Sequence, residues 1–469
     1  MTAPPNKKTT RVSLVHLGCA KNQVDSEVLL GRLASDGAVI CNDVADSEVA
    51  VLNTCAFIGP AREESMSAIR ELVNKKRAGE LRGVIVAGCL TQLFRPDLEA
   101  DPELADVDAF IGLSDYTGIS EVVRAIDDGR NARALTGGAV RGLPIDTVRL
   151  LTGPASFAYL RISEGCDHDC AFCIIPRIRG KHRSKSLQQL RSETEALAAQ
   201  GVREIVMVAE DSTWFGRDTD GPQRLPDAIQ TIADVPGIRW VRAMYAYPNG
   251  LPKGLTTVLR DHENVVEYLD IPIQHIAGNV LKAMRRASSG DRVRETLNML
   301  RAEVPGIALR TTVIVGFPGE TEADFIELLE FVRSFRFERL GAFRYSPEKN
   351  TAANALAGAV PPEEIEKRYD SIMRAQREIV IERNKSLIGK ELEILIDSVD
   401  ARGTATGRTR ADAPEIDCSI RLIGKGFPGQ ILDAKVLSIE NDGYDLVVKP
   451  IKNTVARRGP AGGSAKLQC

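Results

Sequence analysis

The sequence predicts an α/β protein with three modules: an N-terminal doubly wound parallel-sheet domain, a central (βα) barrel and a small C-terminal antiparallel β-barrel. At 469 residues, the chain is longer than a single hydrophobic core normally serves. Short apolar runs alternate with longer amphipathic segments over most of its length, which is typical of parallel strands joined by crossover helices. After about residue 387 the apolar runs are β-rich and separated by Gly and Pro, which favours a small barrel.

The first domain is expected over residues 10–126, followed by a linker over 127–151. Its strands are predicted from four apolar runs, at residues 11–17, 50–53, 83–87 and 109–113. The linker contains a polar, glycine-containing stretch, which is typical of a connection between domains.

The central module is expected over residues 152–386, where the alternation of strands and helices resumes. Apolar runs at 205–208 and 311–315 are predicted strands, and Pro361-Pro362 opens a long charged helix, because proline is tolerated in a first helical turn. The terminal module, 387–453, has predicted strands at 392–396 and 431–436. The remainder, 454–469, is rich in Gly and Ala and is predicted to be a mobile tail.

Composition indicates an intracellular enzyme. The 43% hydrophobic content is ordinary for a globular protein, and no apolar run is long enough to cross a bilayer. The first ten residues are polar and contain no apolar signal core, so we expect a cytoplasmic protein without a membrane partner. Nine cysteines, an odd number, favour thiolate ligands in a reducing compartment over disulfides. The net charge of −3 provides no general attraction to nucleic acid phosphates.

Three closely spaced cysteines, Cys166, Cys170 and Cys173, form the most informative motif. Three thiolates on one loop can hold three irons of a [4Fe-4S] cube and leave the fourth iron open to a ligand from solution. The alternative is a zinc site, because His168 lies inside the loop and would complete a Cys3His tetrahedron. The cluster is favoured, since structural zinc usually takes its ligands from two separated knuckles and His168 would crowd the loop.

The other trio, Cys19, Cys55 and Cys89, lies nearer the N-terminus and follows three predicted strands of the first domain at intervals of 36 and 34 residues. Parallel strands deliver their carboxyl ends to one crevice of an open sheet, so the three thiols are expected to converge. The alternative is that they are buried small hydrophobes, as free cysteines commonly are. The repeated pattern favours a second cluster. The other cysteines are assigned no role, namely Cys41, Cys418 and Cys469.

These two trios resemble those of the methylthiotransferase family of radical S-adenosylmethionine (SAM) enzymes. The resemblance covers about residues 11–452. In the first module it is carried by Leu17-Gly-Cys-Ala-Lys-Asn-Gln-Val-Asp-Ser-Glu and Leu52-Asn-Thr-Cys-Ala-Phe-Ile. In the rest of the chain it is carried by the Cys166–Cys173 loop, Ile174-Ile-Pro-Arg-Ile-Arg-Gly, Gly316-Phe-Pro-Gly-Glu-Thr and a terminal segment similar to a TRAM domain. The resemblance implies two [4Fe-4S] clusters, with SAM as both radical source and methyl donor.

The implied reaction inserts a methylthio group at an unactivated carbon. An aliphatic C–H bond is too weakly acidic for side-chain bases, so a radical is needed. In the implied mechanism, an electron from the cluster on Cys166, Cys170 and Cys173 cleaves SAM to a 5′-deoxyadenosyl radical, which abstracts the hydrogen. The other cluster carries the sulfur, which a second SAM methylates. An electron donor such as flavodoxin or ferredoxin and a sulfur source are therefore expected partners.

Five residues are expected to contact SAM, and no catalytic side chain is assigned. Phe172 precedes the last cysteine of the loop, and Glu210 occupies the place where the superfamily often contacts the methionine amino group. Gly316 and Gly319 would let the backbone approach SAM closely. Arg310 could pair with the SAM carboxylate, although a solvated strand-end arginine is an equal alternative.

The substrate is expected to be a protein. Within the family, Arg410-Ala-Asp-Ala-Pro-Glu-Ile-Asp resembles the RimO-type branch, which modifies an aspartate of small-subunit ribosomal protein uS12; Cys418 then stands where that branch usually has glycine. Residues 387–452 carry nine Lys and Arg against eleven Asp and Glu, and such an acidic domain suits a basic ribosomal protein better than tRNA. The alternatives are a MiaB-like tRNA-adenosine methylthiotransferase and a non-enzymatic metal- or RNA-binding protein.

Overall fold

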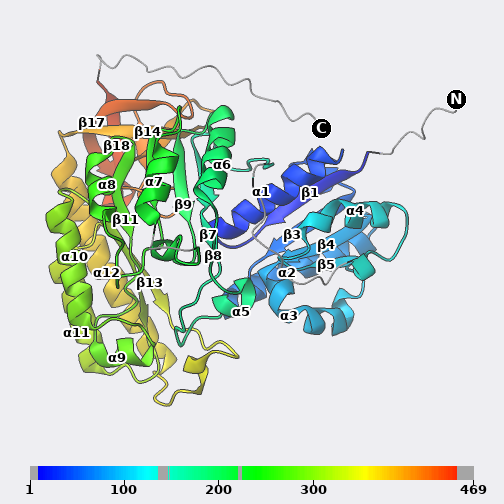
Figure 1. The fold of residues 1–469 in the computed structure, drawn as a ribbon, viewed down its shortest axis with the longest axis horizontal. Helices are drawn as coiled ribbons and strands as arrows, with labels where there is room; N and C mark the ends of the chain where they lie inside the picture. Colours follow the sequence, from blue (N-terminus) through cyan, green and yellow to red (C-terminus); the bar gives the residue numbers. More distant parts are fainter. Residues whose placement is uncertain (1–8, 136–145, 147, 220–223, 452–469) are drawn as a thin grey trace. The chain divides into compact units, whose positions relative to one another are not determined.

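The computed structural model describes residues 9–135, 146, 148–219 and 224–451. The chain forms two compact units, coloured along the sequence in Figure 1. The first contains residues up to Thr152 together with the segment Ile174–Gly180. The second contains Gly153–Cys173 and the described residues from Lys181 to Ile451. Each unit is described by itself.

The first unit is a parallel sheet with helices on both faces, as the alternating pattern predicts. Its strand order is β2-β1-β3-β4-β5, and every neighbouring pair is parallel. The strands are β1 (Arg11–His16), β2 (Val39–Cys41), β3 (Val49–Thr54), β4 (Gly83–Gly88) and β5 (Ala109–Ile111). The helices are α1 (Ala20–Ser35), α2 (Gly59–Arg77), α3 (Cys89–Ala100), α4 (Ile119–Asp127) and, from the discontinuous segment, α5 (Ile175–Arg179).

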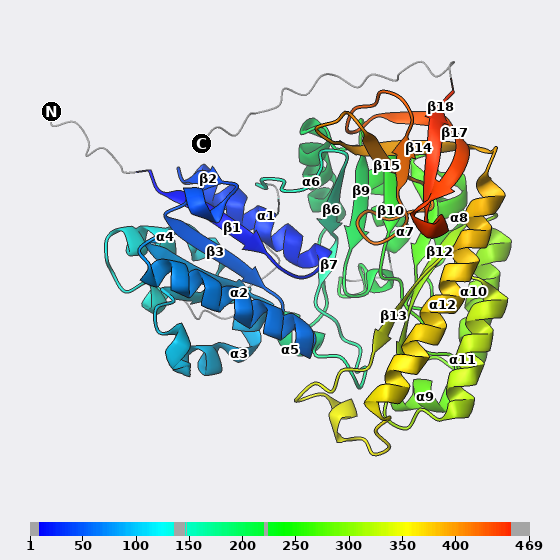
Figure 2. The ribbon, with the colours of Figure 1, turned by 180° about the vertical axis from the view of Figure 1, so that it is seen from behind.

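Two hydrophobic clusters cover the two faces of this sheet. Leu29 of α1 and Ile119 of α4 pack with Val51 on one face. Ile69 of α2 and Leu90 of α3 pack on the opposite face, because successive side chains of a strand point to opposite sides. Ile174 and Ile178 of the discontinuous segment belong to this second cluster, and Figure 2 shows α5 beside α3. The segment after the second cysteine motif therefore completes the core of the first unit.

The second unit is built on a six-stranded parallel sheet, a partial barrel with the order β13-β12-β11-β10-β9-β6. Its strands are β6 (Phe157–Arg161), β9 (Glu204–Val208), β10 (Trp240–Ala243), β11 (Val265–Asp270), β12 (Ala308–Val315) and β13 (Arg339–Arg344), and a separate ribbon pairs β7 (Ser163–Glu164) with β8 (Arg183–Ser184). The helices are α6 (Leu187–Ala199), α7 (Leu225–Ala233), α8 (Leu255–Asp261), α9 (Gly278–Ala283), α10 (Gly290–Glu303) and α11 (Glu322–Phe335). The expected strands at 205–208 and 311–315 are confirmed within β9 and β12.

A long helix and a closed barrel complete the second unit. The helix α12 (Pro362–Leu387) begins at the predicted Pro-Pro pair. The barrel has the strand order β14-β15-β16-β18-β17 and consists of β14 (Glu391–Val399), β15 (Ala405–Thr409), β16 (Ile420–Leu422), β17 (Ile431–Glu440) and β18 (Asp445–Pro450). The prediction of a small barrel is confirmed, although one pair, β16 with β18, is parallel. The predicted tail lies outside the described residues.

The small barrel is docked on the amino ends of the parallel strands through buried charges (Figures 1 and 2). Arg408 of β15 contacts Glu204, the first residue of β9, with 2.7 Å between Nη2 and Oε2. Arg339, the first residue of β13, donates through Nε to Asp412 at 2.8 Å. The Tyr268 hydroxyl on β11 donates to Asp417 at 2.8 Å. All five of these charged side chains are at most 5% exposed.

Two acidic residues of the 410–417 motif are internal. Asp412 and Asp417 are buried against the amino ends of the strands. Burial alone would raise the pKa of Asp412, but the Arg339 guanidinium holds it below its ordinary value. Burial raises the pKa of Asp417 despite the nearby arginines. The motif therefore fastens the barrel to the sheet.

Within the described residues, no helix combines the length and the apolar character that a membrane crossing requires.

Candidate metal centres

The first cysteine trio lies at the carboxyl ends of three adjacent strands of the first unit. Cys19 is the N-cap of α1 and follows β1, Cys55 follows β3, and Cys89 opens α3 directly after β4. Strand β3 lies between β1 and β4 in the sheet. The order of the strands also reverses between β1 and β3, which is where open α/β sheets bind ligands. The structure therefore brings the three predicted cysteines to one edge.

Two glycines let the chain turn sharply just before a cysteine. Gly18 precedes Cys19 with φ +105°, and Gly88 precedes Cys89 with φ +100°. A Cβ on Gly18 would lie 3.0 Å from the Cβ and 3.4 Å from the Sγ of Cys55. Glycine is therefore needed before each of these cysteines for two reasons. The strand ends approach too closely for a side chain, and the positive φ disfavours any residue with a Cβ.

Replacing Gly88 by alanine should destabilise the first unit and disturb the trio. A Cβ there would lie 2.6 Å from the Thr54 carbonyl oxygen and 2.8 Å from the Thr54 nitrogen, which are backbone atoms and cannot move aside. The backbone conformation of Gly88, φ +100° and ψ −158°, is essentially restricted to glycine and costs another residue roughly 1–3 kcal/mol, and overpacking costs a further 1–3 kcal/mol. We therefore expect a loss of about 2–6 kcal/mol in the free energy of unfolding. Urea unfolding followed by circular dichroism would measure it.

The matched control is Gly118→Ala in the same unit. Gly118 has φ −93°, and nothing lies within 4 Å of the Cβ it would carry. This variant should change the free energy of unfolding by less than about 1 kcal/mol. Equal effects of the two substitutions would show that the tight turn before Cys89 is unimportant.

Burial raises the pKa of two thiols of this trio, Cys55 and Cys89. Desolvation raises the pKa of Cys55, and it raises the pKa of Cys89 to about 12, while the nearby Arg179 lowers it in part. The charge of Cys19 influences both Cys55 and Cys89, so the three thiols are electrostatic neighbours. Thiolates are the metal-binding form, so metal binding at this site would release protons.

The second trio lies in the loop after β7 of the second unit, and backbone hydrogen bonds hold this loop on both sides. The Ala171 nitrogen donates to the Met284 carbonyl at 2.9 Å, and the Ala171 carbonyl accepts from the Ala353 nitrogen at 2.8 Å. Burial raises the pKa of Cys166 to about 12, and the charges of Cys170 and Cys173 act in the same direction. The three thiols of this loop are therefore also close to one another.

His168, inside the cysteine loop, is held by Asp211 and Tyr247. Its Nε2 lies 2.6 Å from Oδ2 of Asp211, and its ring stacks on Tyr247 with centroids 4.0 Å apart and planes 11° apart. The same tyrosine is covered by Arg286, whose Nη1 donates to Cys170 Sγ at 3.7 Å. His168, Tyr247 and Arg286 thus pack together against the cysteine loop.

Neither trio is a completed coordination sphere. Among the residues that the structure describes, no group of three or more His, Cys, Asp or Glu side chains is arranged to hold a metal ion. Each cysteine reorients its sulfur by rotation about a single side-chain bond. The donor chemistry, three thiols in each group, suits iron–sulfur clusters, and the six ligand assignments remain predictions.

Two of the expected SAM contacts lie beside the second trio. Phe172 is half-buried and packs in one hydrophobic cluster with Phe317 and Tyr345. Glu210 is half-buried two residues after the end of β9 and directly precedes Asp211, the partner of His168. Both residues are therefore placed next to the cysteine loop.

The glycines of the Gly316–Thr321 turn serve different purposes. A Cβ on Gly316 would lie 2.4 Å from Cγ1 of Ile365, so this glycine is needed for packing against α12. A Cβ on Gly319 would meet nothing within 4 Å apart from its neighbours in the chain, although φ +85° favours glycine. Glu320 braces the turn, since its Oε2 accepts from the Gly316 nitrogen at 2.7 Å.

Arg310 is not at this edge. It is the third residue of β12, six residues before Gly316, which corresponds to roughly 20 Å along an extended strand. Its Nη1 donates to Asp270 at 2.8 Å, and its Nε lies 3.5 Å from Asp417. The arginine is engaged in buried ion pairs with these carboxylates, so we no longer assign it to SAM.

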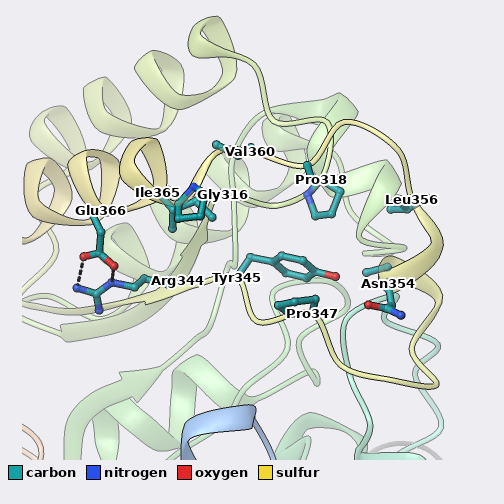
Figure 3. Close-up of a pocket in the computed structure, with 13 residues that line it drawn as sticks. Gly316, Pro318, Arg344, Tyr345, Pro347, Asn354, Leu356, Val360, Ile365 and Glu366 are labelled. Carbon is teal, nitrogen blue, oxygen red and sulfur yellow. Dashed lines mark hydrogen bonds and ion pairs between the residues drawn. The ribbon is translucent and has the colours of Figure 1, made fainter.

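A cavity of about 390 Å³ lies between Gly316, Tyr345 and Ile365 (Figure 3). This volume is in the range of small-molecule sites. In Figure 3 the Tyr345 ring lies between Pro318 and Pro347, and the ion pair of Arg344 with Glu366 closes one side. The lining residue Ala353 is the one whose nitrogen donates to Ala171 in the loop.

Four supporting residues were not predicted from the sequence. Asp211, Tyr247 and Arg286 hold the Cys166–Cys173 loop, and Arg179 contacts Cys89 in the first unit. For Arg179 and Tyr247 there was a signal, because they lie in the runs Ile174-Ile-Pro-Arg-Ile-Arg-Gly and Tyr245-Ala-Tyr-Pro, which resemble the family. For Asp211 the signal was weaker, since it follows Glu210 in a run that departs from the common pattern. For Arg286 there was none.

Comparison with known proteins identifies the family. Three family models match: an uncharacterized protein family, UPF0004, at residues 11–112, the radical SAM superfamily at 160–332 and the TRAM domain at 388–451. A protein from Anaeromyxobacter sp. (strain K) named ribosomal protein uS12 methylthiotransferase RimO is 42% identical over 96% of this chain and 95% of its own length. The chain belongs to the RimO methylthiotransferase family. RimO proteins from Geobacter sulfurreducens and Acetivibrio thermocellus are 39% and 40% identical over 93% and 95% of this chain and 98% and 99% of their own lengths.

Solved structures support the fold of this RimO family member. A radical SAM methyltransferase, TsrM, from Kitasatospora setae has a TM-score of 0.53 and 13% sequence identity, covering 84% of this chain and 79% of its own. At that identity the likeness concerns the fold alone. It agrees with the predicted α/β class, in which an N-terminal parallel sheet is followed by a second parallel-sheet module.

Proposed function

We propose that this chain is a uS12 methylthiotransferase, which adds a methylthio group to the β-carbon of an aspartate in small-subunit ribosomal protein uS12. The observation that carries the proposal is the identity of about 40% over nearly the whole chain to proteins that bear that name. The presence of both cysteine trios in the same chain supports it, because one centre is required to form the radical and the other to supply sulfur.

Two [4Fe-4S] clusters are the proposed resident cofactors. Cys166, Cys170 and Cys173 would hold the cluster that delivers an electron to SAM, and the trio at the ends of β1, β3 and β4 would hold the sulfur-carrying cluster. When bound, these clusters supply the electron and the sulfur. The protein orients the groups and keeps water away from reactive species.

The cavity beside Tyr345 is the proposed position of the adenosine end of SAM. If the methionine end binds the open iron of the loop cluster, the rest of the molecule must extend into adjacent space. The cavity is lined by apolar and aromatic groups around Tyr345, Pro318 and Leu356, which suit a flat base. Phe172, Glu210 and Gly319 remain proposed contacts of SAM, whereas Gly316 acts through packing.

The proposed reaction also needs partners. An electron donor such as flavodoxin or ferredoxin would reduce the loop cluster, and a sulfur source would replenish the first-unit cluster. The target, uS12 in the small ribosomal subunit, implies action in the cytoplasm without a direct tRNA substrate.

The decisive test is a substrate comparison. Enzyme reconstituted with iron and sulfide is incubated with SAM and reductant, in parallel with uS12 and with unmodified tRNA, and both are examined by mass spectrometry. We expect one methylthio group on a uS12 aspartate and none on tRNA. A uS12 variant with asparagine in place of that aspartate is the control. Modified tRNA together with unmodified uS12 would overturn the proposed substrate.

A further inference from the structure

A buried arginine contacts one thiol of the first trio. Arg179 is the last residue of α5, in the segment that belongs to the first unit, and its side chain is 1% exposed. Its Nη2 donates to Oδ2 of Asp25 at 2.8 Å and to Sγ of Cys89 at 3.7 Å. A charge this deeply buried requires a partner, and Asp25, whose side chain is 2% exposed, is an acidic partner of Arg179.

The local structure fixes the position of this arginine. Pro176 lies in the first turn of α5, and Gly180, with φ +74°, ends the helix directly after Arg179. Ile174 and Ile178 anchor the same segment in the core of the sheet. Asp25 lies on α1, the helix that Cys19 caps. The arginine therefore contacts two helices that begin at cysteines of the trio: α1, through Asp25, and α3, through Cys89.

Such an arginine would change the energy of a cluster bound at Cys89. An N–H donor to a ligand sulfur stabilises negative charge on that sulfur, and the fixed positive charge favours the reduced, more negative form of the cluster. A carboxylate at Asp25 opposes this effect, because it is a negative charge near the same sulfur. The balance of the two residues would set how readily the cluster accepts an electron.

We propose that Arg179, held by Asp25, is a positioning residue of the first-unit cysteine centre that donates a hydrogen bond to the Cys89 sulfur and sets the reduction potential of the cluster there. The inference rests on the proposed function, which places a cluster at that trio. It adds that one stretch of chain, residues 166–179, carries both the ligands of one cluster and a hydrogen-bond donor to a ligand of the other.

The experiment uses a full-length background variant in which Cys166, Cys170 and Cys173 are alanine, so that only the first-unit cluster is present, with about four irons per chain. Arg179→Met and Asp25→Asn are introduced separately. Arg177→Met, an exposed arginine of the same helix, is the matched control. The reduction potential is measured by titration monitored by electron paramagnetic resonance, and iron is counted in each protein.

Opposite shifts are expected from the two buried residues. Arg179→Met should lower the equilibrium constant for one-electron reduction about tenfold, a shift of about 59 mV toward more negative potential. Asp25→Asn should shift the potential in the positive direction, and Arg177→Met should leave it unchanged. This difference in sign distinguishes an electrostatic role from a structural one, because loosening the site would move both variants alike.

Unchanged potentials, or shifts of the same sign in Arg179→Met and Asp25→Asn, would overturn the inference. If Arg179→Met does not retain iron, Asp25→Asn decides: a positive shift supports the role, and no shift or a negative one contradicts it. A background protein that folds but binds no iron would instead contradict the proposed cluster, and the inference would fail with it.

Discussion

Replacing Cys166, Cys170 and Cys173 together by alanine should abolish both SAM cleavage and methylthiolation. The electron that cleaves SAM is proposed to come from the cluster on these thiols, and no other group in the chain is assigned that chemistry. Replacing Cys19, Cys55 and Cys89 instead should leave 5′-deoxyadenosine formation but remove transfer of the methylthio group. Loss of one trio should therefore remove both SAM cleavage and methylthio transfer, whereas loss of the other should remove methylthio transfer alone.

Iron analysis and product analysis measure these losses together. The reconstituted enzyme should contain about eight irons per chain and each triple variant about four. Cys41→Ala is the control, because Cys41 ends β2 outside both trios and its thiol contacts the Asp46 carbonyl. This control should retain both iron and activity. Unimpaired methylthiolation after removal of the first-unit trio would contradict the sulfur-carrying assignment.

Asp412→Asn should destabilise the second unit by about 3–5 kcal/mol at pH 7, because it leaves the buried guanidinium of Arg339 without its carboxylate partner. The pKa of Asp412 is lowered in the folded protein from its ordinary value of 3.8. A lowered carboxyl pKa contributes stability that is present above the unfolded pKa and is lost as pH falls through the folded pKa. The difference between the wild type and the variant should therefore stay constant from pH 7 to about pH 5 and narrow below pH 3.8.

Guanidinium unfolding at several pH values would test this expectation. Glu440→Gln is the matched control in the same barrel, since Glu440 pairs with Arg421 at a partly exposed site. A surface pair of this kind contributes about 0–1 kcal/mol, so the control should change little. A small effect of Asp412→Asn, equal to that of the control, would show that the docking charges do not hold the barrel to the sheet.

The alternating pattern of the sequence predicted the fold because each crossover unit has a strong local signal. The strands before Cys19, Cys55 and Cys89 were predicted within a few residues, and their shared edge follows from parallel topology. Strand β2, Val39–Cys41, was not predicted. The membership of α5 in the first unit was also invisible, because it depends on packing between segments far apart in sequence.

Charge was the least predictable property of the site. The acidic residues of the 410–417 motif count the same in a sequence whether they face solvent or a buried arginine, and Asp412 and Asp417 prove to be internal. For the same reason Arg310, expected at SAM, lies in ion pairs at the opposite end of its strand. Composition gives the sum of charges, and only the fold determines which of them cancel.

The discontinuity of the first unit has a consequence for how the chain is made. All strands of its sheet have been synthesised once the chain reaches Thr152. Ile174 and Ile178, which pack on one face of that sheet, are translated later. Until they emerge from the ribosome, one face of the sheet lacks part of its apolar cover. A fragment cut after the linker would retain that exposed patch permanently, so a stable isolated N-terminal domain requires the α5 segment to be supplied as well.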